Sequence, residues 1–495
     1  MNYHRLRVDP VIGADARPVV GQRSGDITRR PALETTARSD MRIGVCVHST
    51  EIRAVTVRDD GAIASHVVPL ADEAGIGGFA QALEQLLDLE RHDEAVTSVT
   101  FDVGAVLRRK AAGRTTFVRI APRAPVDIVH EHPAEAVDGE DVDIVHIAGG
   151  HSNSGEELVP LDAEALVRWC SQAPRGSRYV ITAVGSPINE SHEVRAGQIL
   201  LDHAHPGSVE YSHSFHSSSV AVRERTAAVN SSLIDSAEEI VGALHPVLGR
   251  AVPGARLYVT TNEGGCHPLA RLAVMPVHSL FAEASSALVG AAALAACREG
   301  FVAVRRGEGT FMGQFVRTCP AVFPQFRTSS GAALATQVAN LVEISPEGHG
   351  LPAAAVIVEE TELGDDEAEP DRPVLRTALS LCALGAVVTP LADWAHRVVP
   401  GTTEGEVNAS IIALESRVRA RLVSFGAHDR RIDLLESGVE ASSYDNSSTV
   451  TVRVRGVSLD PIALDRESVV DLVPARPPGR TSSREGRRSD HVPRL

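Results

Sequence analysis

The stretch YVITAVGSPINESHEVRA, residues 179–196, decides the fold because a strand pattern and a helix pattern adjoin within it. Residues 179–184 are apolar, aromatic or β-branched and predict a buried strand. Gly185 and Pro187 predict a turn, and residues 192–203 then follow a helical pattern. A buried strand that leads through a short turn into a helix is typical of an α/β architecture.

Strand and helix patterns alternate on both sides of this stretch. Residues 41–48 and 53–61 predict a β-hairpin, because each is rich in β-branched residues and a short turn separates them. Further helices are predicted at residues 77–89, 162–170, 223–248, 284–297, 375–388 and 403–422. Further strands are predicted at residues 96–101, 116–120, 257–261, 301–305, 432–440 and 449–457. We therefore predict an α/β fold.

The composition disfavours several kinds of partner. With 495 residues, of which 43% are hydrophobic, the chain has room for two or more domains with a large core. Its 64 acidic and 48 basic residues give a formal charge of −16, which disfavours nucleic acid and anionic membranes as partners. Six scattered cysteines, with no CxxC pair and no zinc-ligand spacing, favour a reducing and cytoplasmic setting without a metal site.

Residues 179–196 also resemble a segment of a known protein family. The run SPINESHEVRA, residues 186–196, resembles the SPxNxxHExRA segment of the hydantoinase/oxoprolinase family, in its N-methylhydantoinase A type. Residues 212–230 and the run LYVTTNEG, residues 257–264, resemble two further segments of that family. The likeness is spread over residues 41–457, so it does not depend on one motif.

The resemblance implies a fold. The family is similar to the actin-like ATPases and sugar kinases, in which two ribonuclease-H-like halves close on a nucleotide. We expect those halves here, with a small α+β C-terminal extension and disordered termini. The expected parts are a flexible arm (1–40), a first half (41–222), a shortened second half (223–400), the extension (401–457) and a disordered basic tail (458–495).

The resemblance also implies a class of reaction. Members of the family, among them N-methylhydantoinase A, 5-oxoprolinase and the acetone carboxylase β-subunit, use ATP and magnesium. They hydrolyse cyclic amides such as hydantoins or 5-oxoproline, or carboxylate ketones, commonly beside a B-type subunit. For this chain the resemblance therefore implies ATP and magnesium as cofactors, a small cyclic amide as substrate, and an oligomer.

The first glycine-rich phosphate turn of the family is substituted in this chain. Cys46 and Arg53 stand where the family has acids, and His48 and Ser49 replace paired glycines. Thr50 is retained. An acid near such a turn holds the magnesium ion, so the substitutions remove one of its expected ligands.

The second phosphate turn is also altered. Val304 and Phe311 stand at the positions of its acids, and Arg306 replaces its first glycine. Gly307 and Thr310 are retained. Glycine turns bind phosphate because their backbone N–H groups can approach its oxygens closely, and a side chain at such a position prevents this approach.

Two more family loops fall on acidic residues. The Ser-Gly-Pro loop falls on residues 282–284, which include Glu283, and a Gly-Gly-Gly turn falls on residues 359–361, Glu-Glu-Thr. Carboxylates at the seat of a polyanion oppose its binding. We therefore expect impaired nucleotide use. The residual phosphate contacts would be Thr50, Gly307 and Thr310.

Six residues that match family segments are candidates for the cleft, and no catalytic residue is assigned among them. They are Asn189, His192, Glu193, Arg195, Asn262 and Gly264. Helix capping and an internal salt bridge explain the first four equally well, because these lie at a strand-to-helix corner.

Other side chains leave alternatives open. Cys46 could be a nucleophile beside His48, since alternate residues share one face of a strand, or it could be inert packing. A group of histidines could bind a metal or could be ordinary hydrogen-bonded imidazoles. They are His192, His203, His205, His213 and His216.

Two functions from different classes follow. One is ATP-dependent hydrolysis of a cyclic amide with impaired nucleotide use. The other is a non-catalytic scaffolding or regulatory subunit with a degenerate active site, which pairs with an active homologue or a B-type subunit. An enzyme of this class must bind nucleotide and magnesium in its cleft, whereas a scaffold need only present a surface to its partner.

Overall fold

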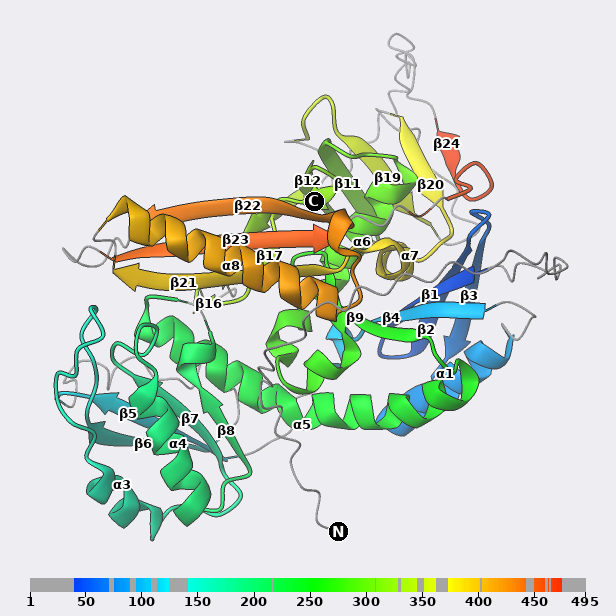
Figure 1. The fold of residues 1–495 in the computed structure, drawn as a ribbon. Coiled ribbons are helices and arrows are strands. Elements are labelled where there is room, and N and C mark those ends of the chain that lie inside the picture. The colour runs from blue at the N-terminus through cyan, green and yellow to red at the C-terminus, as the bar shows by residue number, and fades with distance from the viewer. Residues whose placement is uncertain are drawn as a thin grey trace, which may run out of the picture. The chain divides into compact units, whose positions relative to one another are not determined.

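Figure 1 shows the chain as a computed structural model in which strands and helices alternate from residue 40 onward. The structure describes residues 40–70, 75–89, 95–107, 114–123, 141–215, 217–307, 309–327, 331–344, 351–361, 373–400, 403–441, 449–458, 462 and 464–473. Most of the predicted N-terminal arm, residues 1–39, and the last part of the predicted tail, residues 474–495, lie outside these ranges.

The first sheet has six strands in the order β10-β9-β4-β1-β2-β3. They are β1 Asp40–Val47, β2 Glu51–Arg58, β3 Ile63–Pro69, β4 Ala95–Asp102, β9 Arg256–Thr260 and β10 Cys266–Pro268. Strand β1 is antiparallel to β2 and parallel to β4, and β9 is parallel to β4. The predicted hairpin and the strands predicted at 96–101 and 257–261 are confirmed.

Both faces of the first sheet are covered, which explains why β1 is an almost continuous apolar run. The covering helices are α1 Gly75–Leu89, α5 Val220–Ala251, α6 Ala282–Leu294 and α7 Leu381–Val388. Val45 packs in one core with residues of α1 and α5, whereas Cys46 packs in a second core with residues of α6 and α7. Neighbouring residues of one strand therefore serve two separate cores.

The second sheet has the order β13-β12-β11-β19-β20-β24, with β18 also paired to β12. Its strands are β11 Gly300–Arg306, β12 Gly309–Val316, β13 Cys319–Pro320, β18 Leu341–Ile344, β19 Val356–Glu360, β20 Val374–Thr377 and β24 Asp471–Val473. Strand β11 is antiparallel to β12 and parallel to β19, and β20 is parallel to β19. In both sheets a central strand thus has antiparallel neighbours on one side and parallel neighbours on the other.

Helices α6 and α7 connect the two sheets through a very close backbone approach. A Cβ atom on Gly385 of α7 would overlap the carbonyl oxygen of Ser286 on α6. A Cβ atom on Gly290 of α6 would overlap the carbonyl oxygen of Leu381, and one on Gly44 of β1 would overlap the backbone of α7. Only glycine lets three elements approach so closely.

A separate four-stranded parallel sheet follows the first hairpin and has the order β6-β5-β7-β8. Its elements are β5 Arg114–Ala121, β6 Asp141–Ala148, β7 Arg178–Ala183, β8 Ser208–Tyr211, α3 Ala163–Cys170 and α4 Ser191–His203. Residues 179–196 therefore form most of β7, a turn and the first half of α4, as predicted.

A three-stranded antiparallel sheet in the order β21-β23-β22 lies near the C-terminus, and α8 packs on it. Its elements are β21 Ala392–Pro400, α8 Glu404–Ser424, β22 Ile432–Ala441 and β23 Thr449–Ser458. The remaining elements are short. They are α2 Gly104–Leu107, β14 Val322–Phe323, β15 Phe326–Arg327, β16 Ala333–Leu334, β17 Val338–Ala339 and 3-10 turns at Ser212–Ser214, Leu269–Ala273, Pro276–Ser279 and Asp429–Arg431.

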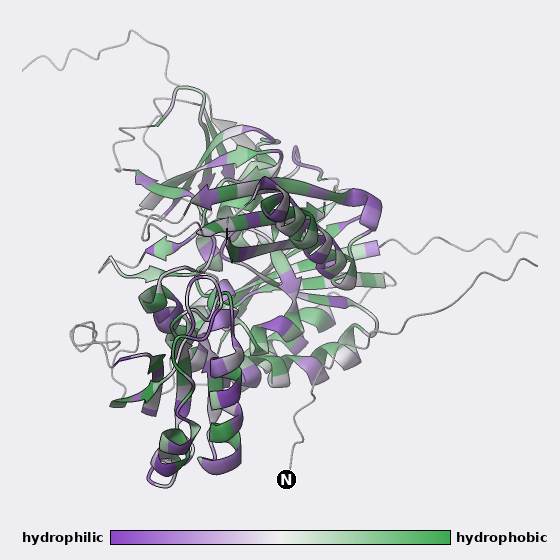
Figure 2. Ribbon diagram, turned by 60° about the vertical axis from the view of Figure 1, so that its left-hand side comes forward, coloured by the Kyte–Doolittle hydropathy of each residue, from purple (hydrophilic) through white to green (hydrophobic). Residues whose placement is uncertain are grey.

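Hydrophobic and hydrophilic residues are interspersed along both the strands and the helices (Figure 2). Helices α6 and α7 are apolar and buried over most of their length, as expected of helices enclosed in a core. Among the helices that the structure describes, none combines the length and apolarity that a bilayer crossing requires.

The structure differs from the predicted segmentation in three places. Residues 375–388 form β20 and α7 rather than one helix, because Ser380 begins a new helix as its N-cap. The expected boundary after residue 222 falls inside α5, and β9 beyond it belongs to the first sheet. Within the predicted tail, residues 471–473 are folded as β24 against β20.

Candidate functional site

Charged side chains from both sheets meet in one cluster. Its members are His48, Arg53, Glu283, Arg306 and Glu360, and we refer to them as the ion-pair cluster. Glu360 Oε1 lies 3.0 Å from Arg53 Nη1 and 4.0 Å from Arg306 Nε. Glu283 Oε1 lies 2.9 Å from Arg306 Nη1 and 3.9 Å from His48 Nδ1. The two arginines and two glutamates therefore form a continuous chain of alternating charge.

The fold brings these residues together because each stands at or near the end of its element. Arg306 and Glu360 are the last residues of the adjacent parallel strands β11 and β19, where they are register partners. Arg53 lies on β2 close to the β1–β2 turn, and Glu283 lies in the first turn of α6. The carboxyl ends of parallel strands and the first turns of helices commonly meet at one edge of an α/β sheet.

The charges of the ion-pair cluster are held by fixed partners. The side chain of Glu360 is 7% exposed, and its second oxygen accepts a hydrogen bond of 3.0 Å from the Leu381 backbone N–H. Burial acts to lower the pKa of Arg306, but the Glu360 and Glu283 carboxylates outweigh it and raise that pKa. Burial lowers the pKa of His48, so the neutral imidazole is favoured.

Two pockets share Arg306 in their walls. The larger has a volume of about 810 Å³ and also contains Glu283. The smaller has a volume of about 590 Å³ and also contains Arg53 and Glu360. The remaining residues that line the smaller pocket are Glu51, Ser65, Val67, Gly307, Thr361, Ala378 and Ser380.

Thr50, Gly307 and Thr310, the predicted residual phosphate contacts, lie in three different kinds of local structure. Thr50 lies in the exposed β1–β2 turn. Gly307 has a φ of +54°, lies in the β11–β12 turn and lines the smaller pocket. Thr310 is 7% exposed and is paired with Ile344 in the second sheet. Of the three, Gly307 has the placement that a phosphate contact would need.

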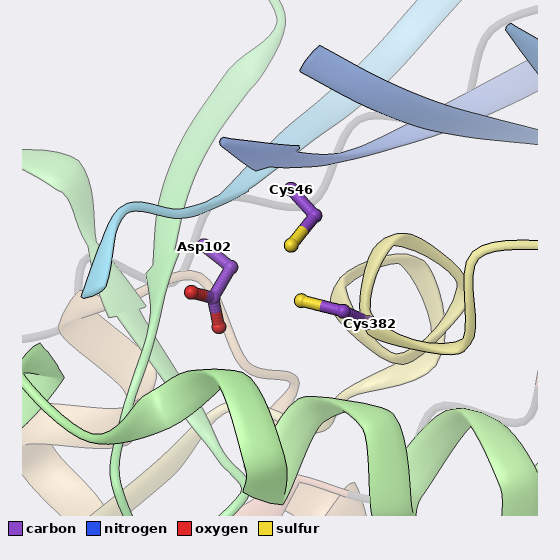
Figure 3. Close-up of side chains that lie close together, drawn as sticks. All are labelled: Cys46, Asp102 and Cys382. Carbon is purple, nitrogen blue, oxygen red and sulfur yellow. The ribbon is translucent and has the colours of Figure 1, made fainter. Parts of the chain in front are cut away.

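Cys46, Asp102 and Cys382 form a second cluster beside β1 (Figure 3), and one potential ligand atom from each lies within 4.8 Å of the others. All three side chains are buried, and burial raises the pKa of each. Asp102 Oδ2 already accepts hydrogen bonds from Thr260 at 2.7 Å and Ser286 at 2.9 Å.

These donors do not fit the magnesium ion that the resemblance implies. Mg²⁺ prefers oxygen ligands, whereas two of the three candidates are thiols and the third is a hydrogen-bonded carboxyl. The raised pKa of Cys46 also favours the thiol over the thiolate, which a nucleophile would need. Figure 3 shows Cys46 directed toward Cys382, so inert packing is the better interpretation of this residue.

Asn189 and Arg195, two of the candidates at the corner between β7 and α4, differ in their contacts. Asn189 Nδ2 donates to the Gly155 carbonyl at 3.1 Å, and its Oδ1 accepts from the Ser191 N–H at 3.2 Å. Arg195 is exposed and forms no ion pair within the described part of the chain. Asn189 therefore connects the start of α4 to the loop after β6.

Glu193 is the most enclosed of the corner residues, with 0% exposure. Its carboxylate accepts from the Ala183 N–H at 2.8 Å, the Ser212 hydroxyl at 2.6 Å, and both the N–H and Nδ1 of His213 at 3.0 and 2.7 Å. Burial alone would raise the pKa of Glu193, but the bonds from His213 and Ser212 lower it. The ionised carboxylate thus links β7, α4 and the 3-10 turn at residues 212–214.

Asn262 and Gly264 lie in the turn after β9. Asn262 Oδ1 accepts from the Phe281 N–H at 2.7 Å, and its Nδ2 donates to the Val277 carbonyl at 2.8 Å and to Thr336 at 3.0 Å. Gly264 has a φ of +81°, which favours glycine. Among the described residues, no hydrogen bond or ion pair joins Asn262 or Gly264 to the candidates at the corner.

His151 and Glu157 lie beside His192, although no sequence pattern singled them out. The His151 and His192 ring centroids are 4.1 Å apart, and His192 Nε2 lies 2.9 Å from Glu157 Oε1. The Gly150 N–H donates to His192 Nδ1 at 2.8 Å. In the neutral ring the proton is therefore on Nε2, which opposes metal binding there. The glycine pair before His151 was the only signal in the sequence.

The other predicted histidines do not gather around a metal position in the described residues. His213 is paired with Glu193, and no cluster of potential metal ligands includes His203 or His205. His216 lies outside the described residues. The fold is more informative than these histidines. The first and second sheets have the same pattern of strand directions, and the closely packed helices α6 and α7 connect them.

That fold is shared with ATP-dependent enzymes. A nucleotide-free acetone carboxylase, described as carrying out ATP-dependent acetone carboxylation, has a TM-score of 0.63 and 10% identity, with 86% of this chain and 88% of that chain covered. The ATP-dependent caprolactamase from Pseudomonas jessenii has a TM-score of 0.61 and 13% identity, with the same coverage. The resemblance to the hydantoinase/oxoprolinase family is thereby confirmed at the level of the fold. No protein-family model and no curated protein matches the chain.

Proposed function

We propose that this protein is a hydantoinase/oxoprolinase-type protein that no longer uses ATP effectively and acts as a non-catalytic subunit. The proposal includes an assignment of the two largest sheets. The six-stranded sheet and the seven-stranded sheet, each with a central strand between antiparallel and parallel neighbours, are the two ribonuclease-H-like halves. The similar strand orders of the two sheets and the likeness to two ATP-dependent structures support it.

The ion-pair cluster is the observation that carries the proposal. Arg53, Glu283, Arg306 and Glu360 come from the four segments that the resemblance aligns with nucleotide-binding loops, and they contact one another. Glu283, Arg306 and Glu360 stand where the resemblance places glycines that would admit phosphate, and Arg53 stands where it places an acid. The two carboxylates supply negative charge at the position of a polyanion. They pair with both arginines, and Arg53 is also paired with Glu51 at 2.5 Å.

Admitting a nucleotide would require this network to open. A partly buried ion pair that loses one partner leaves an uncompensated charge, at a cost of several kcal/mol when the site is desolvated. Glu360 would also have to release the first turn of α7, whose Leu381 N–H it accepts. The triphosphate would then face two carboxylates, and the Cys46, Asp102 and Cys382 cluster among the described residues does not fit magnesium. Each step opposes binding.

The partner in this proposal is a B-type subunit or an active homologue. A subunit that lacks nucleotide chemistry but retains the fold can still stabilise or regulate a complex through its surface. The test is co-expression with a B-type subunit, followed by size-exclusion chromatography. We expect a stable complex, and separate elution of the two chains at micromolar concentration would contradict this part.

The second candidate is ATP-dependent hydrolysis of a cyclic amide such as a hydantoin or 5-oxoproline. The fold likeness and the open turn at Gly307 favour it. An assay of ring opening and ADP release, with ATP and magnesium and with or without the B-type subunit, separates the two. We expect neither product above background. Ring opening coupled to ADP release would establish the enzyme and overturn our proposal.

A further inference from the structure

The larger pocket, of about 810 Å³, shares Arg306 with the smaller one, and nothing above assigns it a ligand. Its volume is in the range typical of sites for small organic molecules. The first turn of α6, the β11–β12 pair and the short strands between β13 and β18 line it. The lining residues are Asn262, Phe281, Glu283, Ala284, Ser285, Arg306, Phe311, Phe323, Pro324, Gln325, Phe326, Arg327, Val338, Ala339 and Leu341.

The apolar part of the lining is aromatic. Four phenylalanines contribute to it: Phe281, Phe311, Phe323 and Phe326. The rings of Phe281 and Phe326 are stacked, with centroids 3.8 Å apart and an interplanar angle of 21°. Phe323 is 50% exposed, so its ring is accessible to a ligand. A flat, apolar ligand would cover these rings and bury surface that water now contacts.

The charged part of the lining is unbalanced. Glu283 is neutralised by Arg306 at 2.9 Å, whereas Arg327 is exposed and forms no ion pair with any described residue. Two arginines against one glutamate leave a net charge of +1 in the wall. A ligand with one negative charge would restore the balance, with Arg327 as its partner.

The polar atoms of two other lining residues are already used. The Asn262 side chain is engaged by Phe281, Val277 and Thr336, and Ser285 donates to the Asn262 carbonyl at 2.5 Å. The uncommitted polar groups of the described lining are therefore the Arg327 guanidinium and the Gln325 amide. Both are suited to a carboxylate, which can accept two hydrogen bonds from a guanidinium and one from an amide.

We propose that this pocket binds a flat aromatic carboxylate, with the ring against the phenylalanines and the carboxylate against Arg327. The proposal does not depend on whether ATP is used, because the ligand contacts that it names, the phenylalanines and Arg327, are not members of the ion-pair cluster, although Glu283 and Arg306 also line the pocket. Its failure is therefore distinguishable from the failure of the proposed function.

The test is calorimetric titration of the full chain with 2-naphthoate, beside its neutral analogue 2-naphthamide and the cation 2-naphthylmethylammonium. We expect naphthoate to bind at least about fivefold more tightly than the amide, because only the anion pairs with Arg327. We expect the cation to bind least well. No binding of naphthoate by the folded protein at about millimolar concentration, or preference for the cation, would overturn the proposal.

Variants locate the site. Arg327→Gln should remove the preference for naphthoate over the amide, and Phe326→Ala should weaken both ligands by about tenfold through loss of ring contact. Arg175→Gln is the matched control, since Arg175 is an exposed arginine near α3 that does not line the pocket. Equal weakening by Arg175→Gln and Arg327→Gln would show general charge attraction and overturn the proposal.

Discussion

Glu263 follows Asn262 directly and is 1% exposed, and neither of its carboxylate oxygens has a hydrogen-bond partner among the residues that the structure describes. Burial raises its pKa to about 7, although nearby Arg455 opposes the shift. The unfolded chain releases this proton near pH 4.5, so between pH 4.5 and about 7 only the folded state retains it. The free energy of unfolding should therefore fall as pH rises through this window, by about 3 kcal/mol in total.

Glu263→Gln removes this titration. We expect the variant to be more stable than the natural chain at pH 8, by up to about 3 kcal/mol, and close to it at pH 4.5, where the carboxyl is neutral in the folded state and still about half-protonated in the unfolded chain. Urea unfolding at the two pH values measures the difference. Glu239→Gln, on an exposed face of α5, is the control and should change little. An equal effect of Glu263→Gln at both pH values would refute the explanation.

Variants of Glu193 and Arg195 distinguish a structural role from a role in the cleft for the residues at the corner between β7 and α4. Glu193→Ala should lower the free energy of unfolding by about 3 kcal/mol or more, since it leaves the buried donors of Ala183, Ser212 and His213 without their acceptor. Arg195→Ala, two positions away and exposed, should stay within about 0.5 kcal/mol. Thermal or urea unfolding measures both. A Glu193 variant of unchanged stability would instead argue for a functional role.

At the scale of elements, the contact of α6 with α7 depends on glycine. Gly385→Ala should destabilise the protein by about 3 kcal/mol or more, because its Cβ would overlap the Ser286 carbonyl in a rigid backbone. The control is Gly242→Ala in α5, where a Cβ meets nothing within 4 Å. That substitution should stabilise by about 0.5–1 kcal/mol through helix propensity. If both variants unfold at the same denaturant concentration, the close approach of α6 and α7 is not required.

The strands and helices with a clear period could be predicted from the sequence. The hairpin of β1 and β2 is rich in β-branched residues on both sides of a short turn, and α4 begins where the period changes from strand to helix. The β20–α7 region could not be predicted in detail, since a four-residue strand and an eight-residue helix in one apolar run have no distinct period. Ser380, the N-cap between them, was the available signal.

Only those features of the candidate site that lie within one segment of the sequence could be predicted. The substituted turns were visible in the sequence, but the pairing of Arg53 with Glu360, which are 307 residues apart, was not. His151 and Glu157 were missed for the same reason, because their partner His192 belongs to another element. Distances between segments depend on the packing of the two sheets, and local patterns do not encode it.

At the scale of the whole molecule, the two glutamates of the ion-pair cluster are expected to exclude polyanions. Replacing Glu283 and Glu360 with alanine would leave Arg306 without these partners and Arg53 with Glu51 alone, and would make this part of the molecule more positive by two charges. We expect the double variant to bind inorganic tripolyphosphate at least about tenfold more tightly than the natural chain, measured by calorimetry at low salt. The control is Glu238→Ala with Glu239→Ala on the exposed face of α5, which should not gain affinity.

The most direct test of the central claim is calorimetric titration of the full natural chain with ATP and magnesium, with a thermal-shift measurement on the same sample. We predict no binding heat and no stabilisation up to about millimolar ATP, from a protein that unfolds cooperatively and is therefore folded. Micromolar binding, with a melting temperature that rises with ATP concentration, would contradict the account. It would show that the ion-pair cluster opens for the nucleotide.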